Sequence, residues 1–106
     1  MLPLLQYGKS GLRVSRLCLG TMNFGIPGHG VHGSWTLPID EARPIFKSAI
    51  EHGINYFDCA NTYGLGACEE VVGTLLRELL PRDEYVLSTK FAMPMGKGAN
   101  QGGLSR

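Results

Sequence analysis

The stretch that decides the fold is Gly53-Ile-Asn-Tyr-Phe-Asp-Cys-Ala-Asn-Thr-Tyr-Gly-Leu-Gly66. Residues Ile54 to Phe57 are β-branched and aromatic and follow a glycine, which predicts a short buried strand. Asp58 comes directly after this strand, and Tyr63 lies five residues further on, in a loop rich in Asn, Thr and Gly. Because α/β folds place their chemistry at the carboxyl ends of parallel strands, this loop is a candidate site.

A second strand is predicted over Tyr85 to Thr89, and Lys90 follows it. An amphipathic segment, residues 68–80, separates the two strands and predicts a helix. A strand–helix–strand unit crosses over right-handedly and makes its two strands parallel neighbours or near neighbours. Since adjacent strands lie about 4.8 Å apart, we expect Asp58 and Lys90 to form an ion pair with Tyr63 above it.

The first half of the chain predicts a hairpin, another strand and a first helix. Short apolar runs over Leu4 to Tyr7 and Leu12 to Val14 flank a glycine-rich turn and predict the hairpin. The extended run Arg16 to Leu19 predicts the strand. Residues 38–52 carry apolar side chains at helical spacing, and Pro44 removes one backbone bond, which allows the regular part of this helix to begin later.

The composition excludes several classes of function. The 106 residues are enough for one small domain, and ten Lys and Arg nearly balance nine Asp and Glu, so no basic patch suggests nucleic acid. No stretch reaches the length of a membrane span or has the pattern of a secretory signal. Cys18, Cys59 and Cys68 show no C-x-x-C spacing, which indicates a cytoplasmic setting without a disulfide framework. Nothing in the sequence indicates an oligomeric state.

A loop rich in glycine and histidine spans residues 26–37. A loop of this length suggests a functional rim, and Trp35 either forms a flat apolar wall for a small substrate or packs the loop down. His29 and His32 have no third ligand close by. We therefore interpret both histidines as solvated loop residues and predict no metal site.

The turn Gly64-Leu-Gly66 before the second helix has the first two glycines of a dinucleotide-binding fingerprint. Glu69 stands where that fingerprint has its third glycine, and five residues, Cys59 to Tyr63, separate Asp58 from the first glycine. We interpret the turn as a loop entering a helix. A flavodoxin-like or Rossmann domain, which would need this turn to hold phosphate, stays an alternative.

Four segments of the chain form one larger pattern. They are Gly11-Leu-Arg-Val-Ser-Arg-Leu-Cys-Leu-Gly-Thr-Met-Asn-Phe-Gly25, Gly53-Ile-Asn-Tyr-Phe-Asp-Cys-Ala-Asn-Thr-Tyr-Gly64, Glu69-Glu-Val-Val-Gly73 and Ser88-Thr-Lys90. In this order and at this spacing they resemble the amino-terminal portion of an aldo-keto reductase, over nearly the whole chain. The loop from His32 to Pro38 further resembles bacterial-type members of that family.

The resemblance implies an α/β fold, namely an incomplete TIM (β/α)8 barrel with an amino-terminal β-hairpin, the first three strands and two helices. Residues 1–106 would form the amino-terminal part of one such barrel domain, truncated before the third barrel helix. The family reduces aldehyde or ketone carbonyls with NADPH, so a small-molecule carbonyl substrate is implied. Since a barrel needs about 250 residues, and the family's catalytic histidine would lie beyond Arg106, we expect a catalytically incomplete fragment.

The resemblance also assigns roles. The family's catalytic residues fall on Asp58, Tyr63 and Lys90. The stretch whose backbone approaches the nicotinamide ribose of NADPH falls on Gly20, Thr21 and Met22, and Asp58 also lies near that ribose. Tyr63 and Trp35 are the expected substrate contacts.

The chemistry suits these residue types. Hydride addition to a carbonyl develops negative charge on oxygen, so a proton donor must lie within reach. Tyr63 would donate the proton, Lys90 would favour the phenolate that remains, and Asp58 would hold Lys90 in place. The competing interpretation is a plain surface ion pair beside a loop tyrosine.

Two cysteines depart from the family pattern. Cys59 stands where the family usually has Thr, and Cys68 where it usually has Ser, which sacrifices an N-cap worth about 1 kcal/mol. Two other functions remain open: a non-catalytic, nucleotide-binding relative of the channel-associated kind, and an inactive truncated product.

Overall fold

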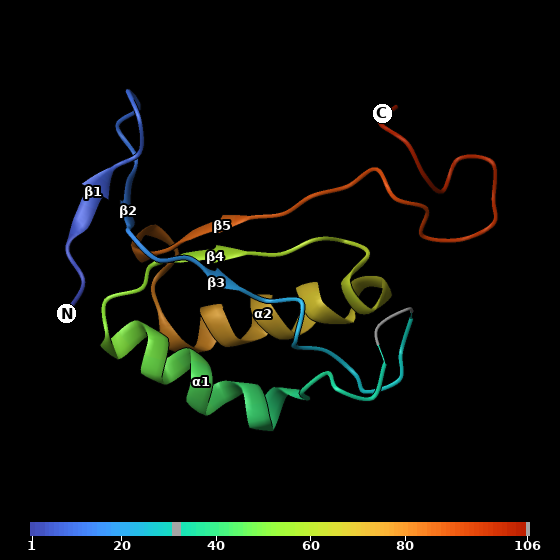
Figure 1. Ribbon diagram of the computed structural model, residues 1–106, viewed down its shortest axis with the longest axis horizontal. Helices are drawn as coiled ribbons and strands as arrows, with labels where there is room; N and C mark the ends of the chain where they lie inside the picture. The colour runs from blue at the N-terminus through green and yellow to red at the C-terminus, as the bar shows by residue number, and fades with distance from the viewer. Residues whose placement is uncertain (31–32, 106) are drawn as a thin grey trace.

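A three-stranded parallel sheet organises the protein (Figure 1). The computed structural model describes residues 1–30 and 33–105. The strands lie side by side in chain order: β3 (Leu19–Gly20), β4 (Tyr56–Asp58) and β5 (Val86–Ser88). In this register Asp58 lies opposite Gly20 on one side and opposite Ser88 on the other.

Two helices connect the strands and cover one face of the sheet (Figure 1). Helix α1 (Ile39–Glu51) lies between β3 and β4, and helix α2 (Ala67–Leu79) lies between β4 and β5. Two short 3-10 turns, η1 (Tyr63–Gly66) and η2 (Arg82–Glu84), lead into α2 and β5. Because every connection is a crossover, the carboxyl ends of all three strands lie at the same edge of the sheet.

The predicted hairpin is present and lies at the amino end of the sheet. Strands β1 (Leu4–Gln6) and β2 (Arg13–Ser15) pair antiparallel. Ser15 and Asn55 tie the hairpin to the start of β4, because the backbone N–H of each donates to the side-chain oxygen of the other, at 2.8 Å and 3.2 Å. The hairpin therefore sits at the end of the sheet opposite Asp58.

The hydrophobic core lies between the sheet and the helices. The ring of Phe57 stacks on that of Phe46 from α1, with centroids 5.6 Å apart, and Phe46 contacts Phe24 edge to face at 5.2 Å. Leu75 and Leu76 of α2 complete the packing, and both are fully buried. Burial of each such side chain contributes about 2–3 kcal/mol, so this core determines which face of β4 points toward the helices.

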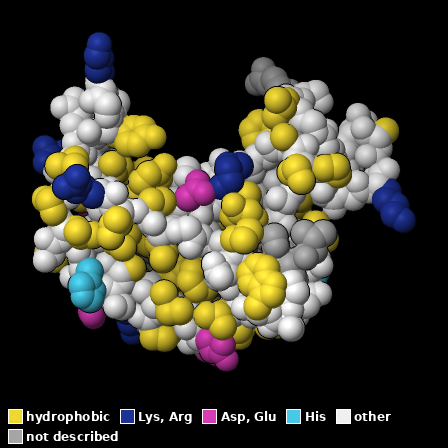
Figure 2. All heavy atoms as spheres, viewed as in Figure 1, with side chains coloured by type: hydrophobic (Ala, Val, Ile, Leu, Met, Phe, Trp, Pro, Cys, Tyr) yellow, Lys and Arg dark blue, Asp and Glu magenta, His cyan; other side chains and the backbone are white. Residues whose placement is uncertain are grey.

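The opposite face of the sheet has no helix over it among residues 1–30 and 33–105. Residues paired across a sheet share a face, so Asp58 and Ser88 lie together on this uncovered side, with the alternating Phe57 on the other. Figure 2 shows the molecule hollowed here, between the hairpin and the carboxyl-terminal segment, with apolar side chains exposed in the hollow. This uncovered face, which a closed barrel would turn inward, agrees with the predicted incomplete barrel.

The predicted bounds of the three strands of the parallel sheet were wrong by one to three residues, and those of the two hairpin strands by one residue. The strand expected over Ile54 to Phe57 is Tyr56–Asp58, because the Ile54 N–H bonds to the Ala49 carbonyl (3.0 Å) and ends helix α1 instead. Asp58 is therefore the last residue of β4 and not the first residue after it. The strand expected over Arg16 to Leu19 is Leu19–Gly20, since only those two residues pair with β4. The strand expected over Tyr85 to Thr89 is Val86–Ser88.

Both predicted helices are present. Residues 68–80 were expected and Ala67–Leu79 are found, while residues 38–52 were expected and Ile39–Glu51 are found. Helix α1 begins at Ile39, so the expectation that Pro44 allows its regular part to begin later was wrong. Pro44 lacks only one N–H donor, and the buried Ala42 and Phe46 on either side hold the helix against the core.

Gly73 in α2 provides a test of the helix. A Cβ built at Gly73 meets no atom within 4 Å, and glycine in a helix interior is about 0.8–1 kcal/mol less favourable than alanine. We expect Gly73→Ala to raise the free energy of unfolding of the 106-residue chain by about that amount in urea titrations. The matched control, Gly53→Ala, should lower it, because Gly53 has φ of +92° and its Cβ would lie 2.8 Å from the backbone nitrogen of Leu2. No increase for Gly73→Ala would contradict the described packing of α2.

Candidate active site

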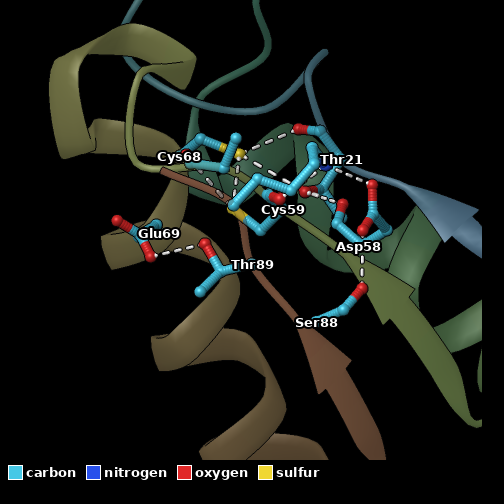
Figure 3. Close-up of polar contacts among 9 residues, drawn as sticks. Thr21, Asp58, Cys59, Cys68, Glu69, Ser88 and Thr89 are labelled. Carbon is cyan, nitrogen blue, oxygen red and sulfur yellow. Dashed lines mark hydrogen bonds and ion pairs between the residues drawn. The ribbon is translucent and has the colours of Figure 1, made fainter. Parts of the chain in front are cut away.

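Asp58 is the centre of a polar cluster at the carboxyl end of the sheet (Figure 3). Lys90 Nζ donates to its Oδ2 at 2.5 Å, and Ser88 Oγ donates to its Oδ1 at 2.5 Å. Thr21 donates to the Asp58 carbonyl through its N–H (3.1 Å) and its Oγ1 (2.7 Å). The expected ion pair is therefore present, and the neighbouring strands hold Asp58 from both sides.

Lys90 lies two residues past β5 and is positioned by backbone hydrogen bonds. The Cys59 N–H donates to the Ser88 carbonyl at 2.8 Å, and the Asn61 N–H donates to the Lys90 carbonyl at 3.0 Å. The Lys90 ammonium also donates to the Cys59 carbonyl at 2.7 Å. These bonds extend the pairing of β4 with β5 beyond the strand ends, which explains how Lys90 reaches Asp58.

Tyr63, the first residue of η1, lies against the same ammonium. Lys90 Nζ is 5.1 Å from the centroid of the Tyr63 ring, and a hydrogen bond with Tyr63 contributes to the raised pKa of Lys90. The structure thus brings together Asp58, Tyr63 and Lys90, the three side chains in which the sequence predicted catalytic roles. Their geometry is observed, and their catalytic roles stay predictions.

The electrostatics of the pair favour its charged form. Desolvation alone would raise the pKa of Asp58, but hydrogen bonds from Lys90 and Ser88 outweigh it and lower that pKa below its ordinary value. Desolvation alone would lower the pKa of Lys90, but hydrogen bonds with Asp58 and Tyr63 outweigh it and raise that pKa. The stability that Asp58 contributes is therefore lost as pH falls through its lowered pKa, and that of Lys90 is lost as pH rises through its raised one. Because both side chains are partly exposed, this stabilisation is modest.

The stretch expected to approach a cofactor begins beside Asp58. A Cβ built at Gly20 meets no atom within 4 Å, and the Met22 side chain is 41% exposed, so both are open at the same edge of the sheet. Thr21 is fully buried and its polar atoms bond to Asp58. Open backbone next to a partly exposed carboxylate fits the approach of a ribose, and the cofactor roles of these residues stay predictions.

A cavity of about 510 Å³ lies beside Tyr63 and Lys90. Its other lining residues are mostly apolar: Ala60, Asn61, Thr62, Leu65, Phe91, Met93 and Pro94. Trp35 is 49% exposed and is not among them, so the structure does not bring it to this cavity, and its role as a substrate wall stays a prediction. A larger hollow of about 740 Å³ lies at the hairpin end of the sheet, away from the polar cluster.

The part of the chain that the structure describes contains neither a group of metal-ligating side chains nor a helix that could cross a membrane. No group of three or more His, Cys, Asp or Glu side chains in residues 1–30 and 33–105 is arranged to hold a metal ion. Of the two loop histidines, His32 lies outside the described residues. Neither α1 nor α2 has the length and apolar character that crossing a membrane requires.

Sequence reasoning missed two polar residues at the site. Ser88 donates to Asp58, and the alternation of side chains along a strand could have identified it, because it lies two residues before Lys90. Asn61 was also missed, and its Oδ1 is buried without a hydrogen-bond donor among the described residues. Since a buried acceptor without a donor is unfavourable by about 1–3 kcal/mol, this atom marks a place where a further donor would be stabilising.

The contributions of Lys90 and Ser88 to the lowered pKa of Asp58 can be tested separately. We expect Lys90→Met to raise the pKa of Asp58, and Ser88→Ala to raise it less, because the hydrogen bond from Lys90 lowers that pKa more than the bond from Ser88. Carbon-13 NMR titration of the Asp58 carboxyl measures both shifts. Lys47→Met on α1 is the control and should leave the pKa unchanged. An unchanged pKa in Lys90→Met would show that the ion pair is absent in solution.

The chain is similar in sequence to known proteins. The sequence model of the aldo/keto reductase family matches residues 16–106. A probable voltage-gated potassium channel subunit beta from Arabidopsis thaliana is 41% identical over 101 residues, covering 93% of this chain and 28% of that protein. A versiconal hemiacetal acetate reductase from Aspergillus parasiticus is 38% identical over 84 residues, covering 78% of this chain and 24% of that protein.

A solved structure agrees with these sequence matches. The aldo-keto reductase AKR11C1 from Bacillus halodurans, in its holo form, superposes with a TM-score of 0.68 at 32% identity, over 92% of this chain and 29% of that one. The chain thus spans 24–29% of the length of these relatives. Because they come from a plant, a fungus and a bacterium, the matches do not assign the chain to the bacterial-type members. Its sequence and fold correspond to the amino-terminal portion of the barrel, and the chain belongs to the aldo/keto reductase family.

Proposed function

We propose that residues 1–106 form the amino-terminal part of one barrel domain of an NADPH-dependent oxidoreductase that reduces aldehyde or ketone carbonyls. The observation that carries the proposal is the contact of the Lys90 ammonium with both Asp58 and Tyr63 at the carboxyl end of the sheet. Membership of the family supports oxidoreductase chemistry, because matched relatives include a hemiacetal acetate reductase.

In this proposal Tyr63 is the proton donor. As a carbonyl is reduced, negative charge develops on its oxygen, and the Tyr63 hydroxyl gives that oxygen a proton. Lys90 stabilises the phenolate that remains, since its ammonium lies 5.1 Å from the centre of the ring. Asp58 keeps Lys90 charged and in place through the 2.5 Å ion pair, so it acts on the proton transfer through Lys90. NADPH, when bound, supplies the hydride.

The proposed cofactor contacts are the backbone of Gly20 to Met22 and the Asp58 carboxylate. Gly20 and Met22 are open to solvent beside Asp58, which supports an approach of the ribose to this edge of the sheet. The buried Thr21 hydroxyl supports this edge by bonding to the Asp58 carbonyl.

A small carbonyl compound is the proposed substrate, and a cytoplasmic setting is proposed with it. The mostly apolar cavity beside Tyr63 and Lys90 supports a substrate with an apolar body, and Trp35 would add a further wall. The cysteines Cys18, Cys59 and Cys68 are odd in number and lack C-x-x-C spacing, which supports a reducing compartment.

A second candidate function is nucleotide binding without catalysis. The match at 41% identity to a protein named as a probable potassium channel subunit favours considering it, because that name describes no reaction. Both functions would use the same edge of the sheet, and only reduction requires a proton donor. Substitution of Tyr63 therefore distinguishes reduction from nucleotide binding without catalysis.

The proposal can be tested in a chimera in which a reductase of known structure provides the rest of the barrel. Residues 1–106 replace the corresponding part of the Bacillus halodurans reductase, and NADPH oxidation with a small aldehyde is measured. We expect Tyr63→Phe to lower kcat by roughly 10²–10⁴-fold with little change in NADPH affinity, because only the proton donor is lost. Tyr7→Phe, in the exposed hairpin, should keep full activity. If the unsubstituted chimera binds NADPH without reducing aldehydes, the non-catalytic function is supported instead.

The isolated chain gives a separate prediction. We expect the 106-residue chain not to oxidise NADPH with an aldehyde, because its three strands leave the site open to water where about eight strands close a barrel. Absorbance of NADPH with and without aldehyde measures this. NADPH oxidation by the purified chain would contradict this prediction and show that residues 1–106 are sufficient for the reaction.

A further inference from the structure

Two buried thiols contact each other beside the candidate site (Figure 3). Cys59 follows Asp58 in the chain, and Cys68 is the second residue of α2. Their Sγ atoms are 3.4 Å apart, and the two residues are 1% and 0% exposed. No step of the proposed reaction uses either thiol.

The surrounding contacts hold the sulfur atoms in this position. Cys68 Sγ donates to the Thr21 carbonyl at 2.9 Å. The backbone of Cys59 is held on both sides, because its N–H donates to the Ser88 carbonyl and its carbonyl accepts from Lys90. A disulfide has a sulfur separation of about 2.05 Å, so the two sulfur atoms need to approach by only about 1.4 Å.

We propose that Cys59 and Cys68 form a redox modification site, which a low-molecular-weight disulfide such as glutathione disulfide converts into an intramolecular disulfide. Local opening of the loop exposes one of the two buried sulfurs, and its thiolate then attacks a sulfur of glutathione disulfide, forms a mixed disulfide and releases one glutathione thiolate. The second cysteine thiolate attacks the protein sulfur of that mixed disulfide and releases the other. Two protein thiols are oxidised, one glutathione disulfide is reduced to two glutathiones, and these take up the two protons.

The hydrogen bonds around the pair tolerate the loss of both thiol hydrogens. The Thr21 carbonyl loses the donor on Cys68 but still accepts from the Phe24 N–H at 3.0 Å. Thr21 Oγ1 still donates to the Asp58 carbonyl at 2.7 Å. Oxidation therefore leaves no Thr21 oxygen without a partner, and the usual penalty for a buried unpaired acceptor does not arise.

The shared hydrogen bond also favours formation of one thiolate. The pKa of Cys59 is lowered, first through its hydrogen bond with Cys68, while the pKa of Cys68 is raised by that same bond and by burial. A thiolate at Cys59 accepts a hydrogen bond from the Cys68 thiol when that thiol turns from the Thr21 carbonyl toward Cys59, whereas two adjacent thiolates would repel each other. One thiolate is therefore favoured for the first exchange step, which takes place when local opening exposes it.

The disulfide would close a ring over residues 59–68, and Tyr63 lies within that ring. It would also join the carboxyl end of β4 to the first turn of α2. Because the Cys59 carbonyl accepts from Lys90, the oxidation takes place at one of the contacts that position the ammonium. This link to catalysis rests on the proposed function, whereas the disulfide itself does not.

The test measures the equilibrium constant for oxidation of the 106-residue chain in glutathione redox buffers, in native buffer and in concentrated urea. Free thiols are alkylated after equilibration. Trypsin leaves both cysteines on residues 48–77, and the oxidised peptide is about 2 Da lighter before alkylation and takes up no label. A second cleavage, after Tyr63, separates the peptide that holds Cys59 from the peptide that holds Cys68, so the two stay together only when the disulfide joins them.

We expect the equilibrium constant in native buffer to exceed that in urea by about tenfold or more, because the fold holds the two sulfurs in contact. Cys18→Ser, which removes the exposed thiol, should keep this ratio. Cys59→Ser and Cys68→Ser should each abolish the linked peptides. A constant in native buffer equal to or below that in urea, or linkage of Cys18 in preference, would overturn the proposal. The measurement needs no turnover, so its result is independent of the proposed function.

Discussion

The register between β4 and β5 is the constraint on which the site depends. It places Asp58 opposite Ser88, and the side-chain alternation of the strands then puts both on the face opposite Phe57. A slip of one residue would turn Phe57 out of the core and Asp58 into it. Because Phe57 stacks on Phe46 within the fully packed core, such a slip is strongly disfavoured. Hydrophobic packing on one face of the sheet therefore determines the position of the charged groups on the other.

The three groups around Lys90 act on it in different ways. Asp58 supplies charge, the Cys59 carbonyl supplies a neutral acceptor, and Tyr63 supplies a polarisable ring and a hydroxyl. The carboxylate has a second donor, Ser88, so its own orientation does not depend on Lys90 alone. An ammonium held in this way has little freedom, and electrostatic effects on a reacting group depend on such fixed geometry. Exclusion of water from the site would strengthen these interactions further.

Much of this arrangement could be predicted from the sequence, for identifiable reasons. The strand–helix–strand pattern between Asp58 and Lys90 determines the handedness and direction of the crossover, so their proximity could be inferred without a structure. Strand ends were less predictable, because residues such as Ile54 satisfy their N–H groups in a helix terminus when the pattern suggests a strand. Ser88 was missed because a serine in a strand has many uses, and its bond to Asp58 depends on a register that a sequence does not display. The position of Trp35 depends on loop geometry, which apolar periodicity does not describe.

The outer edges of β3 and β5 pair with no further strand among residues 1–30 and 33–105. Unpaired backbone groups at a sheet edge recruit additional strands, and here the edge strands flank the cluster around Asp58. A strand added at the outer edge of β5 would lie near Lys90 and thus near the cavity beside Tyr63 and Lys90. A strand paired at that edge would also shield the ion pair of Asp58 and Lys90 from water, which would strengthen it.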